Sequence, residues 1–225
     1  TALVDRYARD NSTTSPILNA LAVSPDYAQD KTVIISGLVG GIQTSHDGGE
    51  TWRLTAPGGA AQLSYLSSGN IMAALHSGGV IRSADNGDQW VAASDGLDLR
   101  GGSASNLAAL NDHAIVLLTP YAERGSAYYL SDADPTWGAI EFDQPVTLTA
   151  AAWVEAANQN LKLLIGTADG RVLPLAASNL KIQSADSLSI KGKAIQSVVT
   201  PDGQQIFIGG GSFGVWKSED GGSTW

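Results

Sequence analysis

The chain has 225 residues, 43% of them hydrophobic, with a formal net charge of −9 at pH 7 and no cysteine. The negative charge argues against binding to nucleic-acid phosphates or to anionic lipid surfaces, and the lack of cysteine excludes disulfides and thiolate metal sites. No apolar run approaches the roughly 18 residues of a membrane-spanning helix, so we expect no direct membrane insertion.

Short strand-like runs separated by turn residues follow one another along the whole chain. Residues 1–9 predict a short strand, and the segment 24–31 predicts a loop between the first two strands of the first group. The other strands fall into successive groups of up to four, which predicts one repetitive all-β domain rather than two small ones. The expected blades cover about residues 17–56, 60–94, 104–143, 147–185 and 194–225. Within them we expect, among others, a buried strand from Thr32 to Ser36 and strands from Val80 to Ser83 and from Trp137 to Phe142.

An eight-residue corner recurs in these groups with the pattern Ser-x-Asp-x-Gly-x-Thr-Trp. Residues 45–52 and 218–225 match it in full, and residues 83–90 depart only at Gln89. The glycines supply the positive φ of a tight hairpin turn, the Asp carboxylate can accept amide hydrogen bonds, and the Trp offers a large surface to bury. We therefore interpret the corner residues as structural rather than catalytic. They are Ser45, Asp47, Gly49, Trp52, Ser83, Asp85, Gly87, Trp90, Ser218, Asp220, Gly222 and Trp225.

Two groups carry an irregular corner. Residues 131–137 are one residue short of the pattern, and residues 178–181 stand where the fourth corner should be but have lost it. Asp47 and Asp220 lie 173 residues apart, so four intervals give a mean period of about 43, as expected for four-stranded propeller blades.

We therefore predict a five-bladed β-propeller of four-stranded antiparallel blades. The fifth group stops before a fourth strand, and residues 1–9 form a strand without a blade of their own. Pairing residues 1–9 with the fifth group would close the ring and remove exposed sheet edges. The alternative is a fragment of a larger propeller whose next strand lies beyond Trp225.

The corner resembles the Asp-box, or BNR, repeat of sialidases, sortilin-type receptor domains and photosystem II assembly propellers. This resemblance implies a β-propeller whose corners lie on the outer rim, and it implies an extracytoplasmic location. It implies no particular activity: sialidases need an arginine triad, a Tyr/Glu pair and an Arg-Ile-Pro type motif, whereas no such motif is found here and arginines are few. Glycosidic cleavage in general needs two facing carboxylates, which spacing alone cannot pair.

Other motifs carry no function in this context. The run 209–214 matches the dinucleotide and nucleophile-elbow glycine patterns, but both patterns need a following helix and a strand is predicted there. His46, His76 and His113 lack the spacing of metal ligands. We expect no metal site and no cofactor.

The longest loops expected around the central channel carry a mixture of aromatic and charged side chains. Such loops suit contact with a partner. The predicted binding residues are Asp98, Arg100, Tyr121, Glu123 and Arg124. From them we predict a non-enzymatic binding or assembly scaffold that presents its loops to a protein partner. The alternatives are a glycan-binding or glycoside hydrolase-like propeller and a fragment of a larger repeat protein.

Overall fold

The computed structural model consists almost wholly of β-strands. It describes residues 17–99, 102–111, 113–120, 126–131, 134–142, 145–155, 161–176, 181–182, 188–189, 194–200, 205–210, 214–220 and 224–225. The strand predicted over residues 1–9, and with it the proposed closure of the ring, lies outside this described part.

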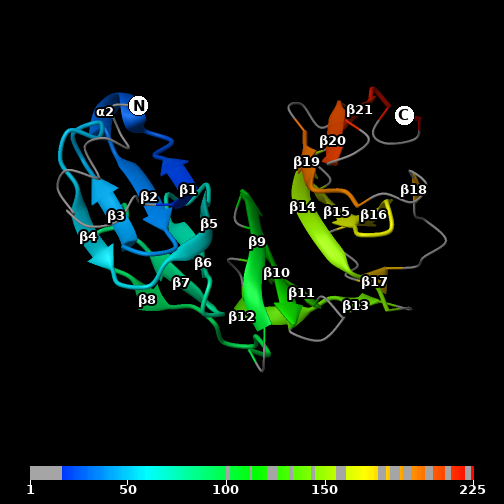
Figure 1. Ribbon diagram of the computed structural model, residues 1–225, viewed down its shortest axis with the longest axis horizontal. Helices are drawn as coiled ribbons and strands as arrows, with labels where there is room; N and C mark the ends of the chain where they lie inside the picture. Colours follow the sequence, from blue (N-terminus) through cyan, green and yellow to red (C-terminus); the bar gives the residue numbers. More distant parts are fainter. Residues whose placement is uncertain are drawn as a thin grey trace.

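The strands form five successive antiparallel sheets (Figure 1). The first contains β1 (Leu18–Val23), β2 (Val33–Gly37), β3 (Gly41–Ser45) and β4 (Arg53–Ala56), and the second β5 (Ala60–Tyr65), β6 (Ile71–Leu75), β7 (Val80–Ser83) and β8 (Val91–Ala92). The third contains β9 (Gly102–Leu110), β10 (His113–Pro120), β11 (Ser126–Ser131) and β12 (Asp134–Ala139). The fourth contains β14 (Leu148–Glu155), β15 (Leu161–Thr167), β16 (Arg171–Ala176) and β18 (Leu188–Ser189), and the last β19 (Ser197–Val199), β20 (Ile206–Gly210) and β21 (Gly214–Ser218).

The structure corrects two local predictions. The expected strand from Trp137 to Phe142 is divided, since β12 ends at Ala139 and β13 (Glu141–Phe142) instead pairs in parallel with β17 (Lys181–Ile182). The loop expected over 24–31 contains one helical turn, α2 (Tyr27–Asp30), closed when the Lys31 amide donates to the Tyr27 carbonyl at 3.0 Å. This turn connects two strands and leaves the strand order unchanged.

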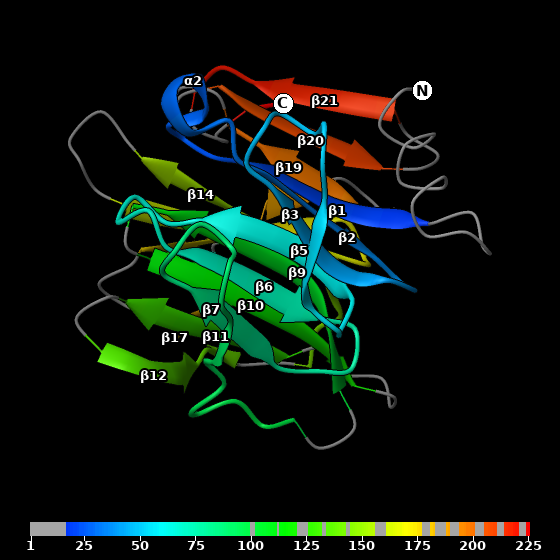
Figure 2. The ribbon, with the colours of Figure 1, turned by 90° about the vertical axis from the view of Figure 1, so that its left-hand side faces the viewer.

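The sheets are arranged as an arc around a common axis. The first strand of each sheet contacts the first strand of the next, in the order β1, β5, β9, β14 and β19. Figure 1 shows the first and last sheets apart from one another, on either side of an opening. Figure 2, turned by 90°, shows β21 at the top of the view and β12 near the bottom. Among the described strands, none of the first sheet pairs with a strand of the last.

Apolar clusters fill each boundary between neighbouring sheets. Successive side chains of β6 point to opposite faces of its sheet and so join different clusters. Ile71 and Ala73 belong to the cluster shared with the first sheet, whereas Met72 and Ala74 belong to the cluster shared with the third. Similar clusters join the third sheet to the fourth and the fourth to the last. The core is thus a series of sheet-to-sheet interfaces, which fixes the position of every corner and loop.

Candidate functional site

The first corner is a turn that its own side chains hold in place. Ser45 is 1% exposed, and its Oγ donates to Asp47 Oδ1 at 2.7 Å and accepts from the Gly49 amide at 2.8 Å. Asp47 accepts a further hydrogen bond from Thr51 Oγ1 at 2.6 Å and one from each amide of Glu50 and Thr51 at 2.9 Å. The hydrogen bond from the Thr51 hydroxyl, followed by those from its amide and from Ser45, lowers the pKa of Asp47 well below its ordinary value.

The second corner has the same hydrogen bonds. Ser83 Oγ donates to Asp85 Oδ1 and accepts from the Gly87 amide, both at 2.8 Å. The Gln89 amide donates to Asp85 Oδ1 at 2.9 Å and is the main cause of the lowered pKa of Asp85. Asp47 and Asp85 are therefore ionised, and donors of their own turn occupy their carboxylate oxygens. This arrangement stabilises the turn and leaves the carboxylates too weakly basic for acid–base catalysis.

The described residues of the last corner make the same hydrogen bonds to the corner aspartate. Ser218 Oγ donates to Asp220 Oδ1 at 2.8 Å, and Thr224 donates to Asp220 through its amide at 2.8 Å and its hydroxyl at 2.6 Å. Gly222 lies outside the described residues. The tryptophans of the two earlier corners, Trp52 and Trp90, each donate from Nε1 to the glycine carbonyl of their own corner at 3.1 Å.

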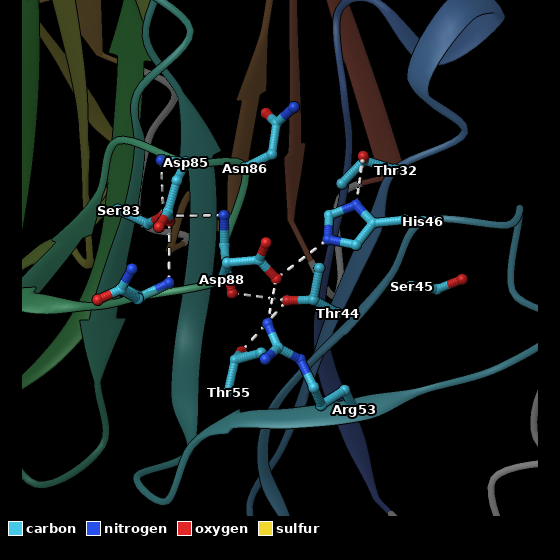
Figure 3. A network of polar contacts seen from close by, with 12 residues as sticks. Thr32, Thr44, Ser45, His46, Arg53, Thr55, Ser83, Asp85, Asn86 and Asp88 are labelled. Carbon is cyan, nitrogen blue, oxygen red and sulfur yellow. Dashed lines mark hydrogen bonds and ion pairs between the residues drawn. The ribbon is translucent and has the colours of Figure 1, made fainter.

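A polar network joins the first corner to the second (Figure 3). His46 Nε2 lies 3.1 Å from Asp88 Oδ1, and its Nδ1 lies 2.9 Å from Thr32 Oγ1. Arg53 pairs with the same Asp88 oxygen. Below them, Thr44 Oγ1 donates to the carbonyl of Gly87 in the neighbouring sheet at 2.9 Å. The network holds the two corners in register.

Asp30 adds a second bridge between these sheets. It accepts from Ser24 Oγ at 2.6 Å, from the Thr32 amide at 2.8 Å and from Asn86 Nδ2 of the second corner at 3.0 Å. Burial alone would raise the pKa of Asp30, but these hydrogen bonds outweigh it and lower the pKa. The bridge depends on the ionised carboxylate.

An open, polar pocket of about 560 Å³ lies beside this network, between the first two sheets. Its lining residues are Asp26, His46, Ser68, Gly69, Ala84, Asp85, Asn86 and Asp88. Asp85 and Asp88 are already engaged by the partners described above. Within the described ranges, no group of three or more His, Asp or Glu side chains could hold a metal ion.

A second pocket has an apolar floor and lies between the outer strands of the second and third sheets. It measures about 250 Å³ and is lined by Met72, Arg82, Val91, Ala92, Ala93, Asp95, Leu130, Ser131 and Pro135. This volume falls below the roughly 300–1,000 Å³ typical of small-molecule sites. The pocket therefore has the size for one or two side chains of a partner rather than for a whole cofactor.

This pocket opens beside the loop that carries the predicted binding residue Asp98. Ser94 fixes the start of that loop, because its Oγ accepts from the Val80 amide at 2.8 Å and donates to the Val80 carbonyl at 3.0 Å. Asp98 is exposed, and its role as a contact residue stays a prediction. The other four predicted residues, Arg100, Tyr121, Glu123 and Arg124, lie outside the described residues, so their grouping stays a prediction.

Sequence reasoning missed the pocket residues. The sequence places Arg82 directly before an intact corner, and Pro135 within the shortened corner of the next sheet. An intact corner followed by a shortened one marks this part of the chain as irregular but does not indicate a pocket. The depth of the pocket depends on how the second and third sheets pack, which no local pattern specifies.

His113 contributes to packing rather than to a metal site. Its Nδ1 lies 2.8 Å from Tyr129 Oη, and its ring centroid lies 5.8 Å from that of Trp153. Trp153 is 6% exposed within the cluster between the third and fourth sheets. This aromatic group is therefore interface core and offers no open platform for a sugar ring. The glycine run 209–214 likewise continues into β21 rather than into a helix.

No helix within the described residues is long and apolar enough to cross a membrane.

No family model matches the chain, and no curated protein matches it. Solved structures do match. That of YCF48 bound to D1 peptide matches with a TM-score of 0.71 and 17% identity, covering 95% of this chain and 68% of that one.

Two further structures agree in fold. The GH74 enzyme of Niastella koreensis matches with a TM-score of 0.67 and 16% identity over 92% of this chain, which spans only 37% of that enzyme. The Cps50 (Swd1) beta-propeller domain of Myceliophteria thermophila matches with a TM-score of 0.66 and 13% identity, covering 91% and 67% of the two chains. These neighbours are β-propellers, and so this chain has a β-propeller fold.

Proposed function

We propose that the chain is a non-enzymatic scaffold that presents a rigid surface to a protein partner. The observation that carries this proposal is the apolar pocket between the second and third sheets. Met72 and Leu130 form a buried floor at 1% and 5% exposure, whereas Val91 stands at the mouth with 63% exposure. An exposed aliphatic side chain beside a buried apolar floor favours a partner's apolar side chain, because docking removes both from water.

Arg82 gives the pocket a polar contact. Its guanidinium has no ion pair or hydrogen bond with another residue in the described ranges, and it lines the pocket together with Asp95. An unpaired guanidinium beside apolar surface can bind a carbonyl or carboxylate with its fork of donors. The pocket thus combines an apolar anchor position with polar groups that would fix the orientation of a peptide segment.

The comparisons support this proposal only at the level of fold. One neighbour, YCF48, was solved with a D1 peptide bound, so one propeller of this general shape accepts a peptide.

We also propose that the corners are Asp-box repeats and that the protein works outside the cytoplasm. Both proposals rest on the resemblance of the sequence. Fractionation of the source cells, followed by detection with an antibody, tests the location.

Selection of a displayed peptide library on the immobilised chain tests the binding role. We expect enriched peptides with a central apolar residue, whose affinity falls at least about tenfold in Val91→Asp and in Arg82→Glu, roughly the loss of one anchor contact. Lys162→Glu is the matched control, because this exposed lysine lies on β15 in another sheet. Equal binding by all four proteins would show that the pocket is not the docking site.

A further inference from the structure

In the first sheet, the residue before the corner serine contacts the corner of the second sheet. This residue is Thr44, which is 3% exposed and lies in a row across the strands, between Ile34 on β2 and Arg53 on β4. Its Oγ1 donates to the Gly87 carbonyl of the second corner at 2.9 Å, and an added Cβ on Gly87 would lie 2.5 Å from Ile34 Cδ1. The second corner therefore closes the gap between these two sheets by direct contact.

Arg82 occupies the equivalent place in the second sheet. It directly precedes Ser83, and it pairs with Met72 on β6 and with Val91 on β8. Met72 is 1% exposed, much as Ile34 is 0% exposed in the row of the first sheet. A charged side chain therefore stands where the first sheet has a neutral hydroxyl.

The corner that follows Arg82 makes no equivalent contact. Pro135 stands four residues after the serine of the shortened corner, where the second corner has Gly87. Proline has no amide hydrogen, so it cannot donate to a corner serine as the Gly87 amide does. Arg82 has no hydrogen bond to this corner within the described ranges, and Arg82 and Pro135 both line the pocket of about 250 Å³. The pocket therefore lies where the first two sheets are joined directly.

Two opposite charges line this pocket. The half-buried guanidinium of Arg82 favours a ligand that brings a carboxylate, because a carboxylate can accept two parallel hydrogen bonds from the guanidinium fork. Asp95 is exposed and makes no ion pair with Arg82 in the part of the chain that the structure describes. A ligand that matches both charges carries an acid on the Arg82 side and no second acid on the Asp95 side.

We propose that the pocket binds an internal segment of a partner protein in which an aliphatic residue and an Asp or Glu lie one or two positions apart. This inference rests on the proposed function and specifies the chemistry of the partner. Neighbouring strands lie about 4.8 Å apart and an extended chain advances about 3.3 Å per residue, so one short segment reaches both Met72 and Arg82. Since Asp95 offers a further contact, a chain that continues through the pocket fits better than a chain end.

Synthetic peptides capped at both ends test this preference, because their termini carry no charge. We expect a peptide with Leu and, two residues later, Glu to bind at least about tenfold more tightly than the same peptide with Gln in place of Glu. Fluorescence anisotropy measures both affinities. The difference should vanish in Arg82→Gln, and Arg82→Glu should prefer a peptide with Lys in place of Glu.

Two further variants sharpen the test. Lys162→Glu is the matched control, because it makes the same charge change at an exposed position of β15 in another sheet and should keep the preference for Glu. Asp95→Asn should strengthen the binding of a peptide with an acid on both sides of the Leu, because the repulsive carboxylate is then absent.

Several outcomes would overturn the proposal. Equal binding of the Glu and Gln peptides, still weakened by Val91→Asp, would contradict the carboxylate preference and leave the proposed function standing. Tight binding only of a peptide that ends in Leu with a free carboxylate would assign Arg82 to a chain end. A clear loss of stability to urea in Arg82→Gln, with no peptide preference, would assign Arg82 to an ion pair within the chain. Binding of no peptide would contradict both proposals.

Discussion

The tryptophans of the intact and the irregular corners are used differently. In the first two sheets, Trp52 and Trp90 donate from Nε1 to a glycine carbonyl of their own corner, and Trp90 also donates to Thr55 Oγ1 of the first sheet at 3.2 Å. Trp137, which ends the irregular corner of the third sheet, instead donates to the Ala93 carbonyl of the preceding sheet at 2.8 Å. Trp153 makes a similar bond, to the Ala108 carbonyl at 3.2 Å, but from the first strand of the fourth sheet rather than from a corner. The tryptophan of an intact corner therefore bonds within that corner, whereas the tryptophan of the irregular third corner bonds to the preceding sheet.

This difference shows that the corner pattern is one of two ways to hold a sheet in the arc. Trp137 is 2% exposed in the cluster between the second and third sheets, and its amide also donates to the Asp95 carbonyl at 2.8 Å. A sheet that lacks the serine–aspartate lock is thus fixed by burying an aromatic side chain against its neighbour. Loss of the pattern therefore does not mean loss of the blade.

The largest expected effect follows from this contrast. Trp137→Ala should lower the free energy of unfolding by about 3–5 kcal/mol, because it leaves a cavity between sheets and removes an inter-sheet hydrogen bond. Trp52→Ala should cost only about 1–2 kcal/mol, because Trp52 is half-buried and bonds within its own corner. Urea unfolding of both variants measures the difference, and equal losses would contradict the distinction.

Gly87 tests whether an intact corner also serves as a joint between sheets. It has φ +86°, and an added Cβ would lie 2.5 Å from Ile34 Cδ1 and 2.9 Å from Thr44 Oγ1 of the first sheet. Gly87→Ala should therefore destabilise by about 2–4 kcal/mol, from backbone strain plus overpacking. Gly69→Ala is the control, because Gly69 has φ +81° with open space around it, and it should cost only about 1–2 kcal/mol of backbone strain.

The intact corners should make stability depend on pH. Folding depresses the pKa of Asp47 and Asp85 from the ordinary value of 3.8, so their contribution is present above that pH and is lost as the pH falls toward the folded-state values. We expect the melting temperature to fall steeply below pH 3.8. The double variant Asp47→Asn and Asp85→Asn should flatten this fall, and an unchanged pH profile would mean that other carboxylates cause it.

The smallest effect is expected at the exposed ion pair of the polar network. Arg53 and Asp88 have side-chain exposures of 65% and 37%, so solvent screens their attraction. Arg53→Ala should change the free energy of unfolding by less than about 1 kcal/mol, and added salt should reduce the difference further. A loss as large as that for Trp137→Ala would show that the network, rather than sheet packing, holds the first two sheets together.

The repeated corners made the sheets predictable, because turn chemistry is local. Thr32 to Ser36 was expected as a buried strand and is observed as Val33–Gly37, and Val80 to Ser83 is observed as predicted. The order of strands within each sheet follows from hairpin connections alone, and the match to propellers confirms the fold class. The number of blades and the closure of the ring stay predictions.

Features that depend on neighbouring sheets could not be read in advance. Nothing in the sequence around Pro135 or Met72 shows that the two residues line one pocket, because the second and third sheets meet there only through packing. The turn at Thr167 and Asp169 was missed for a different reason. It has serine–aspartate-like hydrogen bonds but joins β15 to β16, one hairpin earlier than the corners do.

Hydrogen exchange of the second strand in each sheet tests the packing of sheet against sheet most directly. Strands β6, β10 and β15 are covered on both faces by neighbouring sheets, whereas β20 joins a buried cluster only through the face of Ile206 and Ile208, and Phe207 on its other face is half-buried. The slowest amides of β6, β10 and β15 should therefore exchange at least about tenfold more slowly than those of β20. Equal protection in all four strands would contradict a last sheet whose outer face is less covered than the faces of the inner sheets.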